Sequence, residues 1–145
     1  MANLFPTGSL EATNLTDSTN IKLKDSHAIN LETMEYIKNP DGTVKILDAF
    51  DGYIQWCQLA MMTARYKYKA YSNKFGRDII GKIIDEKAME LELKRITAEA
   101  LMVHPMTSSV DNFVFTWGNG EVYYTYEVTA TNGESKVLNS TEKVR

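Results

Sequence analysis

Cysteine and histidine are scarce in this chain of 145 residues, which has one cysteine, Cys57, and two histidines, His27 and His104. A single cysteine cannot form a disulfide within the chain, and neither histidine has a second histidine or a cysteine at the spacing of a metal site. No G-x-S-x-G, G-x-x-x-x-G-K-[ST] or G-x-G-x-x-G motif is present. The sequence therefore predicts no catalytic, metal-binding or cofactor-binding residues, and we expect no enzyme activity.

The chain also has no excess of positive charge and no long apolar run. Sixteen basic residues stand against 19 acidic ones, a formal net charge of -3. Proteins that bind nucleic acid generally neutralise phosphates with an overall positive field, so this balance argues against them. No window approaches the roughly 18 apolar residues of a membrane-spanning helix, and no basic segment followed by an apolar run opens the chain. We expect a soluble protein that is made in the cytoplasm and has no membrane partner.

Two segments have the apolar periodicity of helices. The first, residues 48–62, carries a broad apolar stripe that includes Cys57, which we interpret as a core side chain. The second, residues 85–103, repeats apolar residues at alternating steps of four and three, as a one-sided core helix does. Asp48 and Asp85 stand at the two N-cap positions, so capping accounts for both carboxylates without any catalytic role.

The remaining patterns are those of β-structure. Residues 32–47 predict a hairpin around an Asn-Pro-Asp-Gly turn, and residues 65–71 alternate basic and aromatic side chains as a half-buried strand does. Residues 113–130 predict two strands joined by a Gly-Asn-Gly turn. We expect an α+β fold in which two main helices pack on a small antiparallel sheet, with an N-terminal hairpin and a C-terminal β-meander.

The domain organisation follows from the same patterns. Residues 1–30 lack periodicity, so we expect a flexible tail or an extended arm that becomes ordered against a neighbour. Residues 31–131 are expected to form the single α+β domain, including a short buried helix over residues 79–84. The Asn-Gly turn at Asn132 predicts a third strand through residues 136–138, but residues 132–145 are polar, so we expect a weakly held edge strand or tail.

A basic stretch between Arg65 and Lys82 contains six basic residues and a single acidic one, Asp78. Tyrosines alternate with these cations, as in proteins that bind single-stranded nucleic acid, so a nucleic-acid-binding module is one alternative function. In a strand, however, the rings would face the core, and the cations would form an exposed row that suits an acidic protein partner equally well. The expected row consists of Arg65, Lys67 and Lys69.

Several residues in a fixed order carry a family resemblance. A T-x-R-Y-x-Y element followed by an aromatic–glycine pair is formed by Thr63, Arg65, Tyr66, Tyr68, Phe75 and Gly76. The chain thereby resembles the sheath-initiator, or baseplate wedge, proteins of contractile phage tails, in particular the version in PBSX-type prophages and R-type bacteriocins. The run 109–113 is similar to the family's entry into its last strands, so the resemblance covers approximately residues 30–131.

The resemblance implies a structural baseplate component that joins the wedge to the sheath and initiates sheath assembly by strand addition. Its implied partners are other wedge subunits, the tail sheath protein and the tail tube or hub, in a particle assembled in the bacterial cytoplasm. Many relatives dock on the wedge core with a Glu-Pro-Arg triplet after the glycine. The nearest residues here are Asp85, Glu86 and Lys87, which join the basic row as expected wedge contacts.

The expected sheath contacts lie in the C-terminal strands. Strand addition needs a well-anchored strand beside an available edge, because main-chain hydrogen bonds supply affinity and alternate side chains supply specificity. The strand over residues 122–130 has an apolar face that anchors it, and the segment that follows lacks proline. We expect the sheath protein to meet Tyr123, Thr125, Glu127, Lys136, Val137 and Leu138.

A lysozyme-like glycoside hydrolase is the second alternative, since similar proteins sometimes carry that label. Such an enzyme needs two carboxyl groups about 5 to 9.5 Å apart, one of them with a pKa raised by an apolar pocket. The nearest cluster is Asp78, Asp85 and Glu86. Neighbouring basic residues would lower the pKa of a carboxyl group there, so the sequence argues against hydrolysis.

Overall fold

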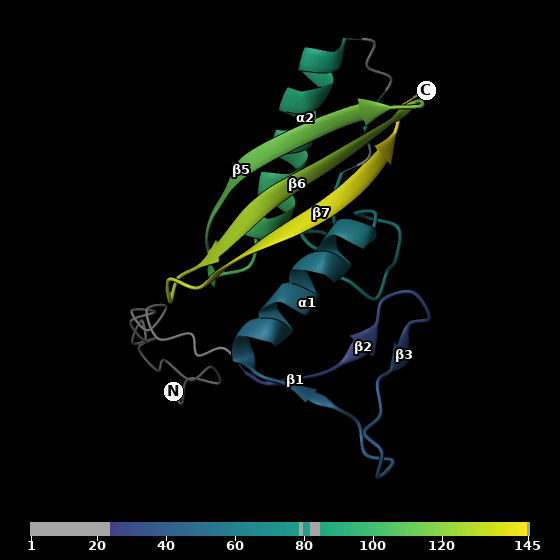
Figure 1. The fold of residues 1–145 in the computed structure, drawn as a ribbon, viewed down its shortest axis with the longest axis vertical. Coiled ribbons are helices and arrows are strands. Elements are labelled where there is room, and N and C mark those ends of the chain that lie inside the picture. Colours follow the sequence, from purple (N-terminus) through teal and green to yellow (C-terminus); the bar gives the residue numbers. More distant parts are fainter. Residues whose placement is uncertain (1–23, 79, 82–84, 145) are drawn as a thin grey trace, which may run out of the picture.

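The computed structural model describes residues 24–78, 80–81 and 85–144, and it has the expected α+β fold (Figure 1). Two helices, α1 (Ala49–Met62) and α2 (Glu86–Met102), accompany a three-stranded sheet formed by the C-terminal quarter of the chain. Neither helix in this described part of the chain is long and apolar enough to cross a membrane.

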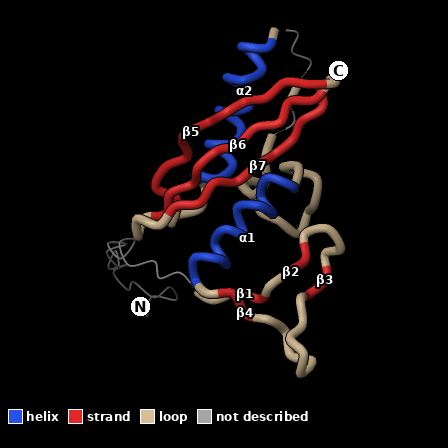
Figure 2. Tube along the Cα trace, viewed as in Figure 1, coloured by secondary structure: helices blue, strands red, loops and turns tan. Residues whose placement is uncertain are grey.

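The sheet is an antiparallel meander with the order β5 (Thr107–Gly118), β6 (Glu121–Ala130) and β7 (Ser135–Lys143). The central strand β6 alternates strictly between buried and exposed residues, as the sequence predicted. Its buried side chains pack against the helices, while in the described part of the chain the opposite face of the sheet carries no helix (Figure 2). The members of the buried row are Val122, Tyr124, Tyr126, Val128 and Ala130.

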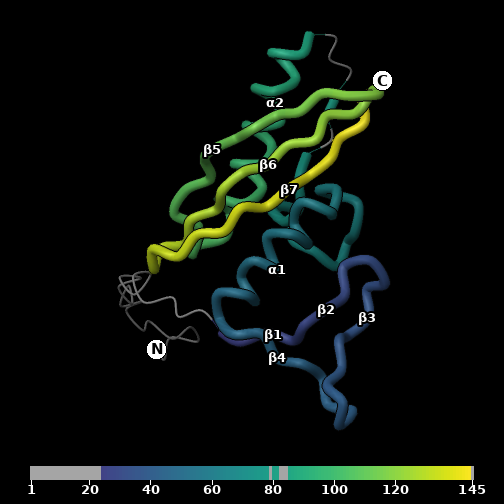
Figure 3. The backbone as a smooth tube through the Cα atoms, viewed as in Figure 1, coloured from purple at the N-terminus to yellow at the C-terminus, as the bar shows by residue number. Residues whose placement is uncertain are grey.

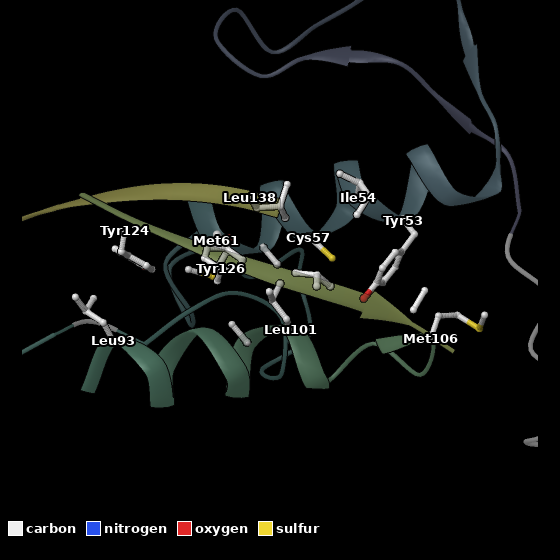
Figure 4. Close-up of a cluster of buried hydrophobic side chains, with 14 of the residues drawn as sticks. Tyr53, Ile54, Cys57, Met61, Leu93, Leu101, Met106, Tyr124, Tyr126 and Leu138 are labelled. Carbon is white, nitrogen blue, oxygen red and sulfur yellow. The ribbon is translucent and has the colours of Figure 1, made fainter. Parts of the chain in front are cut away.

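Both predicted helices are confirmed, together with their caps. The carboxylate of Asp48 accepts the backbone N–H of Asp51, and that of Asp85 accepts the N–H of Ala88. Each bond satisfies an N–H group that has no partner within the helix. The buried faces of α1 and α2 meet the inner face of β6 in one core, which is shown in Figure 4.

Four two-residue strands precede α1: β1 (Ser26–His27), β2 (Ile29–Asn30), β3 (Glu35–Tyr36) and β4 (Ile46–Leu47). β1 pairs with β4 and β2 pairs with β3, so the two arms of the expected hairpin pair mainly with residues 26–30. Around the predicted Asn-Pro-Asp-Gly turn the arms do meet, through a bridge between Lys38 and Val44. The side chain of Gln55 binds the backbone of His27 and Ile29, and this attaches the strands to α1.

The expected strand over residues 65–71 is wrong. The chain makes one parallel bridge, between Ala64 and Arg77, and then runs through a series of turns. Tyr66 has a backbone φ of 66°, which lies in the left-handed region and is incompatible with a strand. Of the short helix expected over 79–84, only residues 80 and 81 lie in the described part of the chain, and they are not helical.

The third strand is longer and better held than the sequence suggested. β7 pairs with β6 over nine residues, and its side chain at Leu138 is only 4% exposed because it enters the core beside α1. Near the far end of the strand, the carboxylate of Glu142 lies 2.6 Å from the guanidinium of Arg77. β7 nevertheless forms an edge of the sheet (Figure 3), as predicted.

Candidate functional site

One candidate site is the open edge of β7, whose hydrogen-bonding pattern can be read from its two ends. Ala130 N donates to Glu134 O at the turn, and Val144 N donates to Gly120 O at the other end. Residues of an antiparallel strand alternate between bonding to one neighbour and pointing away from it. With the observed register, the even-numbered residues of β7 bond to β6. The N–H and C=O groups of the odd-numbered residues, among them Val137, Asn139 and Thr141, point to the open edge.

The other edge of the sheet is less regular. β5 has two register shifts against β6, between Thr107 and Ser109 and between Asp111 and Val114. Asn112 lies within the second shift and has a positive φ of 56°. Such bulges interrupt the regular spacing that an added strand requires. β7 is therefore the edge better suited to pairing with another chain.

The expected sheath contacts divide between the two faces of the sheet. The register places Tyr123, Thr125, Glu127 and Val137 on the open face, where they are partly or fully exposed. A hydrogen bond from Asn112 lowers the pKa of Glu127 and keeps it charged on this face. Lys136 and Leu138 belong to the opposite face. For Leu138 the prediction of an available contact is wrong, because its side chain completes the core.

Arg65 is also not the exposed contact that the sequence predicted. Its side chain is only 9% exposed and donates a hydrogen bond of 2.7 Å to Glu99 on α2. The same guanidinium donates to the carbonyl of Gly76 over 3.2 and 3.3 Å and lies 3.8 Å from Asp78. The bond to Glu99 is the main cause that raises the pKa of Arg65. Arg65 thus links α2 to the segment that follows α1. It does not form an exposed row with Lys67 and Lys69.

Gly76, the glycine of the aromatic–glycine pair, has a structural role beside Arg65. Its φ is +99°, and a Cβ atom on it would lie 2.7 Å from the carbonyl oxygen of Thr63. The two segments approach so closely because Arg77 N donates to Thr63 O and Arg65 N donates to Arg77 O. Only glycine combines this φ with this backbone contact.

The ion-pair network on α2 predicts an acid-sensitive stability. The hydrogen bond from Arg65 lowers the pKa of Glu99 from its ordinary value of 4.5, so the folded state favours the charged form. This stabilisation is present above the unfolded pKa and is lost as the pH falls through the folded one. Replacing Glu99 with glutamine is expected to flatten the decline of the unfolding free energy below pH 4.5, as measured by urea denaturation.

The control for this prediction is Glu32→Gln, at an exposed turn position that has no ion pair among the described residues. That variant is expected to keep the decline of the parent. An equal acid response in Glu99→Gln and the parent would contradict the role of the Arg65–Glu99 pair.

The two groups of expected wedge contacts lie apart. Asp85, Glu86 and Lys87 begin α2 and are exposed, whereas Arg65 meets Glu99 near the other end of the same helix. At 1.5 Å per residue, the 14 positions between Asp85 and Glu99 correspond to about 21 Å. Lys67 and Lys69 are exposed on the loop after α1. The structure therefore offers two separate surfaces.

Next to the start of α2 is a pocket of about 380 Å³, which the sequence did not predict. Asp85, Glu86, Met89 and Trp117 belong to its lining, and Asp78 does not. Asp78 instead faces two arginines, Arg65 and Arg95. The three carboxyl groups considered for glycoside hydrolysis are thus not gathered around this pocket.

The cysteine and the histidine of the core are packed side chains. Cys57 is fully buried, and burial raises the pKa of its thiol to about 12. His104 packs against the rings of Tyr53 and Trp56, and its Nδ1 accepts the N–H of Met106. Burial lowers the pKa of this histidine. Among the residues that the structure describes, no three histidine, cysteine or acidic side chains lie close enough together to hold a metal ion.

Comparison with known proteins gives the class of the molecule. Residues 26–135 match the family described as contractile injection system sheath initiator, and because the match covers most of the chain, the protein belongs to this family. The resemblance noted in the sequence is confirmed. Sheath initiators are structural components of a contractile tail baseplate, so this chain is assembled into the tail structure beside sheath and baseplate components. No curated protein matches the chain.

Proposed function

We propose that this sheath initiator starts sheath assembly by accepting a strand of the tail sheath protein at the open edge of β7. The observation that carries the proposal is the alternation along β7, which points the backbone groups of Val137, Asn139 and Thr141 away from β6, toward an edge that pairs with no strand among the described residues. An added strand would gain main-chain hydrogen bonds from these groups. The rest of the domain would hold β7 in the baseplate wedge.

Two features support β7 as the receiving strand. Its inner side is anchored by Leu138 in the core and by the ion pair between Glu142 and Arg77. Its outer side chains continue onto the open face of the sheet, beside Tyr123 and Thr125. A sheath strand placed there would pair with a strand that is already fixed, so little ordering entropy is lost on binding.

Replacing Asn139 with proline tests the edge directly. Proline removes one N–H group and projects its ring into the edge, while the bonds of β7 to β6 are made by the neighbouring residues. Losing one backbone hydrogen bond, together with the steric block, is expected to reduce sheath nucleation about tenfold or more. Electron microscopy of particles that carry the variant would count sheathed tails.

Two variants control this experiment. Asn139→Ala keeps the N–H group and is expected to give normal sheathed tails. Ser140→Pro removes a bond to β6 and is expected to lower the melting temperature, because that position belongs to the ladder. Normal sheathed tails with a folded, incorporated Asn139→Pro protein would refute strand addition at β7.

We place the wedge contacts on the two exposed surfaces, with Lys67 and Lys69 on one and Asp85, Glu86 and Lys87 on the other. Arg65 stabilises the first surface without being exposed on it, because its guanidinium donates hydrogen bonds to the carbonyl of Gly76 and to the carboxylate of Glu99. The two surfaces lie on different elements, so substitutions on one leave the other intact. This separation allows each surface to be tested alone.

A further inference from the structure

The loop after α1 exposes an unusual set of side chains. Tyr66, Tyr68 and Tyr71 are 74%, 50% and 52% exposed, whereas the tyrosines of α1 and of the inner face of β6 are buried. Lys67 and Lys69 alternate with these rings, Lys74 follows them, and all three lysines are exposed. We call residues 66–74 the tyrosine–lysine loop. Clustered exposed aromatic side chains are a feature of protein contact surfaces, where tyrosine is enriched.

The loop is fixed in place by an aromatic chain that reaches the core. The ring of Tyr68 meets that of Tyr71 at 6.0 Å, and Tyr71 meets Phe75 at 4.8 Å. Phe75 in turn packs on Trp56 of α1, with ring centroids 5.6 Å apart. Turn hydrogen bonds at Lys67, Tyr71 and Phe75 shape the backbone between them. The rings of Tyr68 and Tyr71 are therefore fixed before a partner binds, and they lose little conformational freedom on binding.

The backbone of Tyr66 also has an unusual conformation, with a φ of 66°. A left-handed φ at a large non-glycine residue costs about 1 to 2 kcal/mol. The ring gains no burial in return, since it is the most exposed of the three. Residues with such a backbone conformation occur often at ligand clamps and switch regions. Because Met34 has a similar φ of 60° and is also exposed, the conformation of Tyr66 supports a binding role only together with the exposed rings and the charge of the loop.

The charge of the loop identifies the kind of partner. Residues 66–76 contain three lysines and no acidic residue, although the whole chain has a net charge of -3. Within the described residues, none of these lysines has a carboxylate within 4.0 Å, while Arg65, Arg77 and Arg95 each have at least one. Lys67 lies over the ring of Tyr68 at 5.3 Å. A complementary surface would supply carboxylates between apolar side chains.

We propose that the tyrosine–lysine loop binds an acidic protein segment of a neighbouring baseplate subunit. The carboxylates of this segment would pair with the lysines, and its apolar side chains would cover the rings of Tyr66 and Tyr68. A nucleic acid fits less well, because single strands need a basic groove that follows the backbone, and three lysines on one loop match only a few phosphates. The inference rests on the proposed function only in placing the partner in the baseplate.

The experiment measures binding of the purified full chain to baseplates assembled without it. One variant carries Lys67→Glu, Lys69→Glu and Lys74→Glu, and a second carries Tyr66→Ala and Tyr68→Ala. Each is expected to weaken binding about tenfold or more, and the affinity of the parent is expected to fall as salt rises. The matched control carries Tyr36→Ala, Lys38→Glu and Lys45→Glu in the hairpin, where Tyr36 is 59% exposed. It is expected to bind like the parent.

The outcomes separate this inference from strand addition at β7. Loop variants that reach the baseplate at high concentration are expected to nucleate sheath normally, whereas Asn139→Pro is expected to bind baseplates normally and to nucleate poorly. Unchanged binding of both loop variants would overturn the inference. Retention of the parent on single-stranded DNA, lost in the loop variants while baseplate binding stays the same, would assign the loop to nucleic acid and would also overturn it.

Discussion

Replacing Gly76 with alanine is expected to destabilise the protein by about 3 kcal/mol or more, among the largest effects of any single methyl group in this fold. The added Cβ would lie 2.7 Å from Thr63 O and 3.1 Å from Arg65 N, and both of these are backbone atoms that cannot rotate away. The segments around Thr63 and Arg77 would have to separate. Their two hydrogen bonds and the contacts of Arg65 would then be lost together.

Gly42→Ala is the matched control for this experiment. Gly42 has a similar φ of +88°, but no atom lies within 4 Å of a Cβ placed there. Its substitution therefore carries the conformational cost alone, about 1 to 2 kcal/mol. Urea denaturation of both variants would measure the difference. Equal losses at the two glycines would show that the close approach at Gly76 contributes nothing.

Replacing Leu93 with aspartate is expected to unfold the protein, with a loss of more than about 4 kcal/mol. Leu93 is 0% exposed and lies where α2 meets the inner face of the sheet (Figure 4). An aspartate at this position would either bury a charged carboxylate or become protonated. Both states cost folding free energy relative to leucine. None of the buried residues in the described part of the chain is basic, so no buried cation is available to pair with it.

The same helix provides the control. Leu91, two residues earlier, is 66% exposed, so Leu91→Asp is expected to change the unfolding free energy by less than about 0.5 kcal/mol. Circular dichroism and thermal melting of both variants would give the comparison. A Leu93→Asp protein that melts like the parent would mean that the buried face of α2 has been misassigned.

The helices and the C-terminal strands could be predicted because their local signals agree with their environment. Asp48 and Asp85 cap the helices that they precede, and the alternation along residues 122–130 matches the burial of every second side chain. Patterns of this kind are reliable where one face of an element enters the core. The fold class followed from them.

The loop after α1 was not predictable in the same way. Alternating lysine and tyrosine has the period of a strand, but here it arises on a series of turns whose rings are exposed. The deciding facts are the left-handed backbone of Tyr66 and the approach of Gly76 to Thr63, and the second joins residues from separate segments of the chain. The internal role of Arg65 follows from the same contacts, since Glu99 is 34 positions away.

The strand on which we propose the sheath site was predicted in outline, and the structure corrects how firmly it is held. Hairpin signals at Asn132 and Gly133 correctly indicated a third strand beside β6. The polar composition of this segment suggested that the strand is weakly attached. The polar residues instead belong to the exposed outer face of the strand, and its inner residue Leu138 is buried. Removing residues 132–145 would therefore damage the core as well as the edge. A single proline at Asn139 separates the two effects.

The antiparallel pairing of β6 and β7 also determines how the protein would respond to pulling. The hydrogen bonds of the ladder run across the strands, so a force along β7 loads all nine paired positions at the same time. A force that lifts β7 sideways would instead break the pairs one after another. If the sheath is attached along β7, tension directed along the strand is resisted by the whole ladder, and Arg77 with Glu142 secures the end where peeling would begin.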